Sequence, residues 1–342
     1  MRIKRKEFLE QLESVRPGLS AREVIEQSSC FVFQNKRVFT YNDEIACHRK
    51  SLLDDIEGAV QAEPLLAILS KLPEKVIDIS IKDNELFIRG KQRKSGIRME
   101  SKIVLPVDSV EQPKGWKKLP TNFADAVKWV QPCAGDNQSQ FNMTCIHLCK
   151  SWMEACDNYQ AIRFKIKTDI RKPTLIRKDS IKHIIEMDMI DVSQTRRWIH
   201  FRNSSGLTLS CRHWMEEYPN LENLLRKGRG EPWDLPKGLK EAIEKAQVFS
   251  SEDPAGDNMI MRLQPGSVTV TGRGAAGWFS GRKKSLYKGS SLEFGISTRI
   301  LLELVEHFNE YQCKISETRL KVKGGKLVYI TVLGKTKEKK KK

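Results

Sequence analysis

Apolar residues recur at helical spacing in three segments that each open a similar stretch of chain, residues 5–15, 122–130 and 237–247. They stand at i, i+4 and i+7, which places them on one face of an α-helix. A second amphipathic segment follows each time, at residues 63–72, 179–187 and 297–308. Asp179 and Ser297 are the expected N-caps of two of these segments. The pattern therefore predicts two helices in each stretch.

Alternating apolar and polar residues close each stretch around a polar turn, at residues 76–90, 197–211 and 313–325. This period of two predicts hairpins that are half buried against a layer. The first helices recur at steps of about 115 residues, the size of a domain. Segments 106–120 and 227–238 are rich in Pro, Gly and charge, as expected of linkers that make few contacts. The sequence predicts an α+β fold of three repeated domains, residues 1–117, 118–232 and 233–334, each with two helices on antiparallel sheet.

Charge narrows the class of partner. The chain has 60 Lys and Arg against 43 Asp and Glu, a formal net charge of +17, which indicates a polyanion such as nucleic acid or an acidic membrane surface. Residues 335–342 hold six lysines and one glutamate, and we expect a disordered tail that adds nonspecific affinity for DNA. Because no segment reaches the roughly 18 apolar residues of a membrane span and no secretion signal is present, we predict a soluble cytoplasmic protein with reduced, mostly buried thiols.

Catalytic and metal chemistry find little support in the sequence. Cys145, His147, Cys149 and Cys156 raise a zinc hypothesis, but "TCIHLCKSW" alternates as a strand and lacks paired C-x2-4-C knuckles. The six histidines stand apart from any nucleophile elbow or H-E-x-x-H motif. Residues 271–285 are Gly-rich and basic but lack the G-K-[ST] ending of a phosphate loop, so a mobile basic loop is expected there. We predict no metal, no cofactor and no enzymatic activity; a nucleic-acid enzyme whose site escapes motif analysis stays an alternative.

Three phrases, taken in order, carry a family resemblance: "ACDNYQAIRF" (155–164), "EYPNLENLL" (217–225) and "LKEAIEKAQVFSSE" (239–252). The first looks like the A-T-D-G-H-R-L-A turn, the second is similar to the F-P-D-Y motif and the third resembles the start of the third domain in the beta sliding clamp of bacterial DNA polymerase III. With these motifs the chain resembles that family over nearly its whole length, whether its source is a bacterium, a phage or a plasmid. The resemblance implies a homodimeric six-domain ring that encircles double-stranded DNA and takes short peptides of DNA polymerase, clamp loader and other partners in a groove.

Site residues follow from the helix faces and from the resemblance. Basic residues expected to contact DNA without reading its sequence are Arg22, Lys128, Lys178, Lys182, Lys240, Lys245 and Arg299. For any one lysine a merely solvated face is an equal alternative, and glutamates on the same helices predict a mixed lining that favours mobility. The resemblance places the peptide groove at Met143, Cys156, Asn158, Gln160, Ala161, Pro219, Asn223, Leu224, Ile330 and Val332.

Two departures from the family bear on partners. The usual G-H-R is replaced by Asn158, Tyr159 and Gln160, so the partner peptide is expected to differ from the usual consensus. At the subunit interface Val248 and Phe249 match an apolar pair of the family, whereas the facing positions are Glu100 and Lys102, which predicts a more polar dimer contact. A protein of the same fold that binds DNA nonspecifically without forming a ring is the alternative function.

Overall fold

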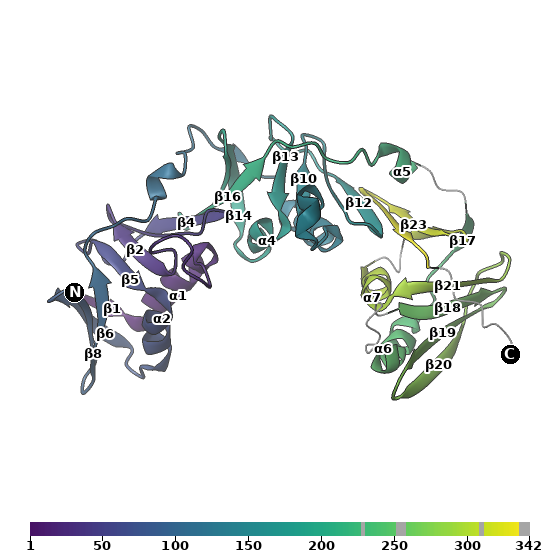
Figure 1. The fold of residues 1–342 in the computed structure, drawn as a ribbon, viewed down its shortest axis with the longest axis horizontal. Helices are drawn as coiled ribbons and strands as arrows, with labels where there is room; N and C mark the ends of the chain where they lie inside the picture. Colours follow the sequence, from purple (N-terminus) through teal and green to yellow (C-terminus); the bar gives the residue numbers. More distant parts are fainter. Residues whose placement is uncertain (227–229, 251–257, 308–310, 335–342) are drawn as a thin grey trace. The chain divides into compact units, whose positions relative to one another are not determined.

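The computed structural model describes residues 1–226, 230–250, 258–307 and 311–334; the predicted lysine-rich tail, residues 335–342, lies outside them. The chain forms two compact units. The first contains residues 1–132, 136–153 and 166–218, and the second contains residues 133–135, 154–165 and the chain from residue 219. Both combine α-helices with antiparallel strands, so the predicted α+β class is confirmed (Figure 1). The division into three domains stays a prediction.

Helices of the first unit follow the periodicity of the sequence. Its α-helices are α1 (Arg5–Val15), α2 (Ala62–Lys71), α3 (Phe123–Val130) and α4 (Lys178–Ile181). Short 3-10 helices are η1 (Arg16–Gly18), η2 (Val107–Ser109), η3 (Gln131–Cys133, which reaches the second unit), η4 (Gln138–Thr144) and η5 (Lys182–Glu186). The apolar stripe Phe8, Leu12 and Val15 of α1 is fully buried. The predicted cap Asp179 is wrong, because α4 begins at Lys178 and its N-cap is Arg177.

Strands of the first unit pair antiparallel throughout. They are β1 (Arg2–Lys4), β2 (Cys30–Gln34), β3 (Arg37–Tyr41), β4 (Ile45–Lys50), β5 (Gly58–Gln61), β6 (Val76–Lys82), β7 (Glu85–Arg89), β8 (Lys94–Glu100), β9 (Lys117–Lys118), β10 (Cys145–Leu148), β13 (Thr174–Arg177), β14 (Met189–Gln194), β15 (Trp198–Asn203) and β16 (Thr208–Trp214). The predicted hairpins are β6–β7 and β15–β16. At the first of them, Asp83 and Asn84 both have positive φ, as a tight two-residue turn requires.

A ladder between β4 and β16 joins the first two repeats, with Ile45 opposite Cys211 and His48 opposite Thr208. One buried cluster continues across it and includes Trp198 together with Leu105 and Val110. The expectation of a loosely packed linker at 106–120 is therefore wrong: Val110 is buried, and Lys117 and Lys118 pair with β14. Of its few apolar residues, Val110 and Leu119 are buried, and Val107 and Trp116 are half-buried.

The second unit contains two sheets. The strands of the first are β12 (Gln160–Lys165), β17 (Glu231–Trp233), β22 (Gln312–Ile315), β23 (Arg319–Gly324) and β24 (Leu327–Val332); β11 (Trp152–Cys156) enters the unit with its last three residues. The second sheet contains β18 (Asn258–Gln264), β19 (Ser267–Gly274), β20 (Gly277–Lys284) and β21 (Leu292–Ser297), in the order β20-β19-β18-β21. The helices are α5 (Glu222–Arg226), α6 (Leu239–Ser250) and α7 (Thr298–His307).

Helices α6 and α7 lie on one face of the β18–β21 sheet (Figure 1). Contact is close at Gly272, where an added Cβ would stand 1.9 Å from the carbonyl oxygen of Ala246, and at Gly281, next to Ala242. Residues 271–285 are thus a β-hairpin, and the predicted mobile loop is wrong. Gly277 and Gly281 take two of the four inward positions of β20 where the helix approaches closely, and Phe279 is the single apolar residue among these positions, so most of the apolar half of the strand pattern is missing from the sequence.

Candidate peptide groove and nucleic-acid interface

The turn at Asp157–Gln160 is fixed by its own first side chain. Asp157 Oδ1 accepts hydrogen bonds from the backbone N–H of Tyr159 and of Gln160, each at 2.7 Å, and the Asp157 N–H donates to the Gln160 carbonyl at 3.0 Å. The Tyr159 carbonyl accepts a bond from the Val332 N–H at 2.8 Å. An acidic residue here therefore shapes the turn and holds it on β24, as expected of Asp in such turns.

Strands β12 and β24 bring the predicted groove residues of this unit together. Gln160 lies opposite Thr331 and Ala161 opposite Ile330. Gln160 is buried, and its Oε1 accepts a hydrogen bond from the Tyr329 hydroxyl at 2.8 Å. Tyr159 and Val332 stay accessible, with 65% and 43% of their surface exposed. The turn thus presents two apolar side chains at the end of a rigid ladder.

Helix α5 contacts both β12 and β24. Arg163 on β12 binds the buried Glu154 at 2.7 Å and Glu222 of α5 at 2.5 Å. Burial alone would lower the pKa of the Arg163 guanidinium. The hydrogen bonds that Arg163 donates to Glu222 and Glu154 outweigh burial and raise this pKa. Arg163 therefore anchors the helix that carries Asn223 and Leu224.

The remaining groove candidates differ in exposure. Cys156 is buried at the end of β11, and Asn158 is exposed on the turn. Pro219 and Leu224 are half-buried, and Asn223 is exposed on α5. All predicted groove residues except Met143 belong to the second unit. Met143 is half-buried in η4 of the first unit.

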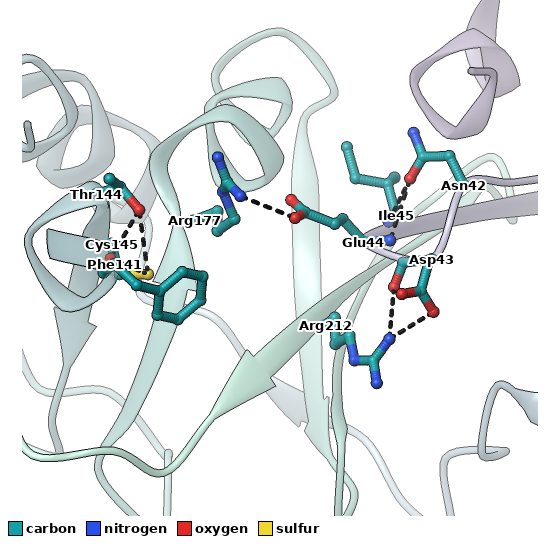
Figure 2. A network of polar contacts seen from close by, with 9 residues as sticks. All are labelled: Asn42, Asp43, Glu44, Ile45, Phe141, Thr144, Cys145, Arg177 and Arg212. Atoms are coloured by element: carbon teal, nitrogen blue, oxygen red, sulfur yellow. Dashed lines mark hydrogen bonds and ion pairs between the residues drawn. The ribbon is translucent and has the colours of Figure 1, made fainter. Parts of the chain in front are cut away.

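The same turn recurs in the first repeat, where Asn42 takes the place of Asp157 (Figure 2). Asn42 Oδ1 accepts bonds from the backbone N–H of Glu44 and Ile45 at 3.2 and 2.8 Å, and the Glu44 carbonyl accepts from the Arg212 N–H at 2.8 Å. Arg212 therefore stands where Val332 stands in the second unit.

Charged side chains surround the turn of the first repeat, residues 42–45. Arg177 binds Glu44 at 3.0 Å and Arg212 pairs with Asp43 (Figure 2). Burial raises the pKa of Glu44 even with Arg177 beside it. The sequence analysis missed both ion pairs; the register of the repeated hairpins would have aligned Arg212 with Val332.

The structure gives the exposure of three predicted DNA-contacting residues and the acidic partners of the other four. Arg22, Lys128 and Arg299 are exposed. The others pair with acids: Lys182 with Asp179 at 3.0 Å, Lys240 with Glu306 at 2.8 Å and Glu244 at 3.8 Å, Lys245 with Glu241 at 2.7 Å, and Lys178 with Asp136 at 2.5 Å. The hydrogen bond to Glu306 raises the pKa of Lys240. Only 12% of the Lys178 side chain is exposed, so its expected place on a solvent face is wrong.

Residues predicted at the subunit interface belong to different units, Val248 and Phe249 to the second and Glu100 and Lys102 to the first. Val248 is exposed on α6, and the ring of Phe249 is half-buried against Gly277. Glu100 and Lys102 are exposed in the first unit, where Gln27 Nε2 donates to the Glu100 carboxylate at 2.7 Å and to the Lys102 carbonyl at 2.8 Å.

Cysteines and histidines are placed as structural residues. All eight cysteines are buried with free thiols, as predicted. Cys149 Sγ lies 3.3 Å from Nε2 of His147, next to β10. Within the described ranges, no group of three or more His, Cys, Asp or Glu side chains is arranged to hold a metal ion. Among the helices of the same residues, none is long and apolar enough to cross a membrane.

Sequence comparison alone gives no assignment: no family model matches the chain, and no curated protein does. Solved structures do match. The sliding clamp of Pseudomonas aeruginosa bound to griselimycin has 15% identity and a TM-score of 0.82, over 98% of this chain and 99% of that chain. The clamp of Bartonella birtlesii bound to griselimycin has 13% identity and a TM-score of 0.85, with the same coverage. The DNA polymerase III beta subunit of Thermotoga maritima has 12% identity and a TM-score of 0.82, again over 98% and 99%.

These matches extend over almost the entire chain. Together with the repeated hairpins and helices, they define the architecture as a DNA-clamp fold. More particularly, the chain has the fold of the bacterial DNA polymerase III beta sliding clamp, and the resemblance predicted from the sequence is confirmed at this level.

Proposed function

We propose that the protein is a non-enzymatic DNA sliding clamp, which closes as a homodimeric ring around duplex DNA and tethers a polymerase, a clamp loader and other partners through a peptide groove. The clamp fold supports this function. One further observation supports the ring in particular. The same antiparallel pairing between repeats occurs twice within the chain, as β4–β16 and β12–β24, and the two strands that could form a third such pairing between two copies are both present.

The two ladders share their register. In the first, Ile45 lies opposite Cys211 directly after the Asn42 turn. In the second, Gln160 lies opposite Thr331 directly after the Asp157 turn. A repeated register of this kind is specified by the turn and by burial of one face. The third repeat has the corresponding hairpin, with Gly274 opposite Gly277.

The strands that could form the third ladder, between two copies of the chain, are β20 and β8. Among the described residues, β20 pairs with β19 alone, and β8 pairs with β7 and, at its end, with β5. Two copies arranged head to tail would pair these edges in the established register, with Gly277 opposite Ile97. Phe249, which lies against Gly277, would then lie beside the strand that carries Ile97 and the predicted Glu100. A backbone ladder with apolar support explains how a polar pair is tolerated at this contact.

DNA binding would be nonspecific and weak at each contact. Lys182, Lys240 and Lys245 already pair with acids, so a phosphate must compete for each ammonium group. Exposed ion pairs of this kind are worth little, about 0–1 kcal/mol, so the exchange is nearly neutral. Contacts that form and break easily suit a protein that slides.

The function is tested by retention on circular DNA after loading by the cognate loader. We expect the protein to stay bound at high salt and to be released when the circle is cut, since a ring is held by topology and not by charge. Release from intact circles as salt rises would show a simple nonspecific DNA-binding protein instead.

The dimer is tested by sedimentation of a Val248→Asp variant. Val248 is exposed within one chain, so a charge there should weaken association at least tenfold and leave the fold intact. Leu286→Asp, at another exposed apolar residue of the same unit, is the matched control and should associate as the wild type does. A purely monomeric wild type at micromolar concentration would refute ring closure.

The groove is tested with a fluorescent polymerase peptide that carries Leu or Phe. Replacing Met143 or Val332 with alanine should weaken binding, and Tyr159→Ala should do the same because its ring is exposed beside Val332. Leu286→Ala serves as the control. Unchanged affinity in all three variants would contradict the assignment of the peptide groove to these residues.

A further inference from the structure

Among the helices of the described residues, α6 and α7 cover one face of the β18–β21 sheet and none covers the other. Inward side chains of β18 and β19, such as Met259, Met261 and Val270, are fully buried on the side of α6 and α7. Residues between them point the other way. We call this surface the open face; its members are Ile260, Arg262, Thr269, Thr271, Arg273, Trp278, Ser280, Arg282, Lys284 and Glu293.

The strand registers arrange the open face in rows. Ile260 and Ser280 both lie opposite Thr271, and Thr271 Oγ1 is 3.2 Å from Ser280 Oγ. Arg262 and Arg282 both lie opposite Thr269. Arg273 lies opposite Trp278, whose indole is 62% exposed.

The open face is basic. It carries Arg262, Arg273, Arg282 and Lys284 against a single acid, Glu293, which Arg262 Nε binds at 2.7 Å. Arg282 donates to Ser267 Oγ at 3.0 Å. A surface with this excess of guanidinium groups is complementary to a polyanion.

Comparison with the first repeat shows that this face is not an uncovered core. The turns align Gln34–Arg37 with Gln264–Ser267. This alignment and the strand registers put Ile260, Arg262, Thr271 and Ser280 at the positions of the buried Cys30, Val32, Tyr41 and Ala46, which pack with Leu105 and Val110.

In the third repeat none of the corresponding positions is buried, and all except Ile260 are charged or polar. An apolar covering segment, such as the one in the first repeat, would bury the charged Arg262 and its neighbours at a cost of several kcal/mol. A charged, hydrated ligand fits these residues better.

We propose that the open face binds single-stranded nucleic acid. Four-stranded sheets that present an aromatic ring among basic side chains stack unpaired bases on the ring and hold phosphates with the cations. Here Trp278 supplies the ring, with Arg273 beside it, and Arg282 and Lys284 continue along the same strand. Bases in a duplex are stacked on each other and offer no free face to an indole, and an acidic peptide has no need of one.

The site is independent of the proposed clamp activity. It lies within one unit and uses none of the predicted groove residues or helix lysines. Pairing of β20 with a second copy would use the backbone edge of the strand, whereas the open face is formed by its outward side chains. Both activities can therefore operate in one molecule.

The test measures anisotropy of fluorescein-labelled oligothymidylate with the full-length protein at low salt. Trp278→Ala should weaken binding about tenfold, because stacking on one aromatic ring is worth about 1–3 kcal/mol per base. Trp278→Phe should retain most of the affinity. Arg273→Ala and Arg282→Ala should each reduce the salt dependence by about 0.7 in log–log slope, the value for one phosphate of a single strand. Leu286→Ala is the control and should bind as the wild type does.

Three results would overturn the proposal: equal affinity of Trp278→Ala and wild type, displacement by polyglutamate as effective as by unlabelled oligothymidylate, or preference for a duplex of the same length. Sedimentation of Trp278→Ala checks that assembly is unchanged. Retention of this variant on circular duplex DNA separates failure of this site from failure of the clamp.

Discussion

Protonation of His200 should loosen the β15–β16 hairpin. The ring is 1% exposed, with Nδ1 2.8 Å from Ser210 Oγ and Nε2 3.2 Å from Thr195 Oγ1. The Thr195 hydroxyl donates to the Trp198 carbonyl, so it accepts from Nε2–H, and Nδ1 accepts from Ser210. The neutral ring satisfies this arrangement. A second ring proton would have no acceptor unless Ser210 turned.

Burial, with a smaller effect from the charge of His48, lowers the pKa of His200 from 6.5 to about 4. Since the unfolded state takes up the proton more readily, stability is intact above pH 6.5 and is lost as the pH falls from 6.5 towards 4. Linkage with these two pKa values gives a loss of about 2.5 kcal/mol between about pH 7.5 and pH 4.5.

Native-state hydrogen exchange of peptides from β15 and β16, corrected for the intrinsic pH dependence of exchange, measures this loss as the free energy of local opening. His200→Gln does not titrate and should show a pH dependence that is flatter by about 2.5 kcal/mol over the same range. Titrating groups that do not interact with His200, such as Asp191, affect both proteins and cancel in the difference. Parallel pH profiles for the two proteins would refute the assigned burial and hydrogen bonds.

Three further changes test the packing. Trp198→Ala should lower the free energy of unfolding by about 3–5 kcal/mol in urea titration, because it empties the cluster that joins the first two repeats. Gly272→Ala should lower the free energy of unfolding by about 1–3 kcal/mol, because the added Cβ forces α6 away from β19. Gly115→Ala is the control and should be neutral, since no atom lies within 4 Å of its added Cβ. Equal melting temperatures of the two variants would contradict the close helix contact. Asp157→Ala should remove the hydrogen bonds that fix the turn and so weaken peptide binding, measured by isothermal titration, with a smaller loss of stability, measured by thermal melts. A loss of stability with unchanged peptide affinity would show that the turn has only a structural role.

Periodicity predicted the elements where one face is apolar. The stripe of α1 and the alternation of β6–β7 appear as expected, because burial selects the residues that make the signal. Strands β15 and β16 form the predicted hairpin, but most of their residues are buried on both faces, so the expected half-burial is wrong there. The β19–β20 hairpin escaped prediction because the inward positions of β20 hold Gly277, Gly281 and Lys283, and only Phe279 among them is apolar. A strand with one inward apolar residue and a largely basic outer face has no clear alternation of hydrophobicity to detect.

Site residues were predicted less completely than elements. The resemblance located the Asp157 turn, and the structure shows why that residue type is needed there. Spacing alone does not reveal whether a helix lysine is free or paired, so Lys178 was assigned to a solvent face although Asp136 binds it. The open face escaped notice because its cations come from separate strands and meet only when the sheet forms.

The strand ladders of the clamp fold also bear on how far such chains can diverge. The paired position after the turn holds Ile45 and Cys211 in one ladder but Gln160 and Thr331 in the other, so neither an apolar nor a polar pair is required. Backbone hydrogen bonds, which every residue except proline supplies, keep the register in both cases. Selection at these positions acts on geometry more than on residue identity, and an architecture joined in this way survives comparison at 12% to 15% identity over nearly the full chain.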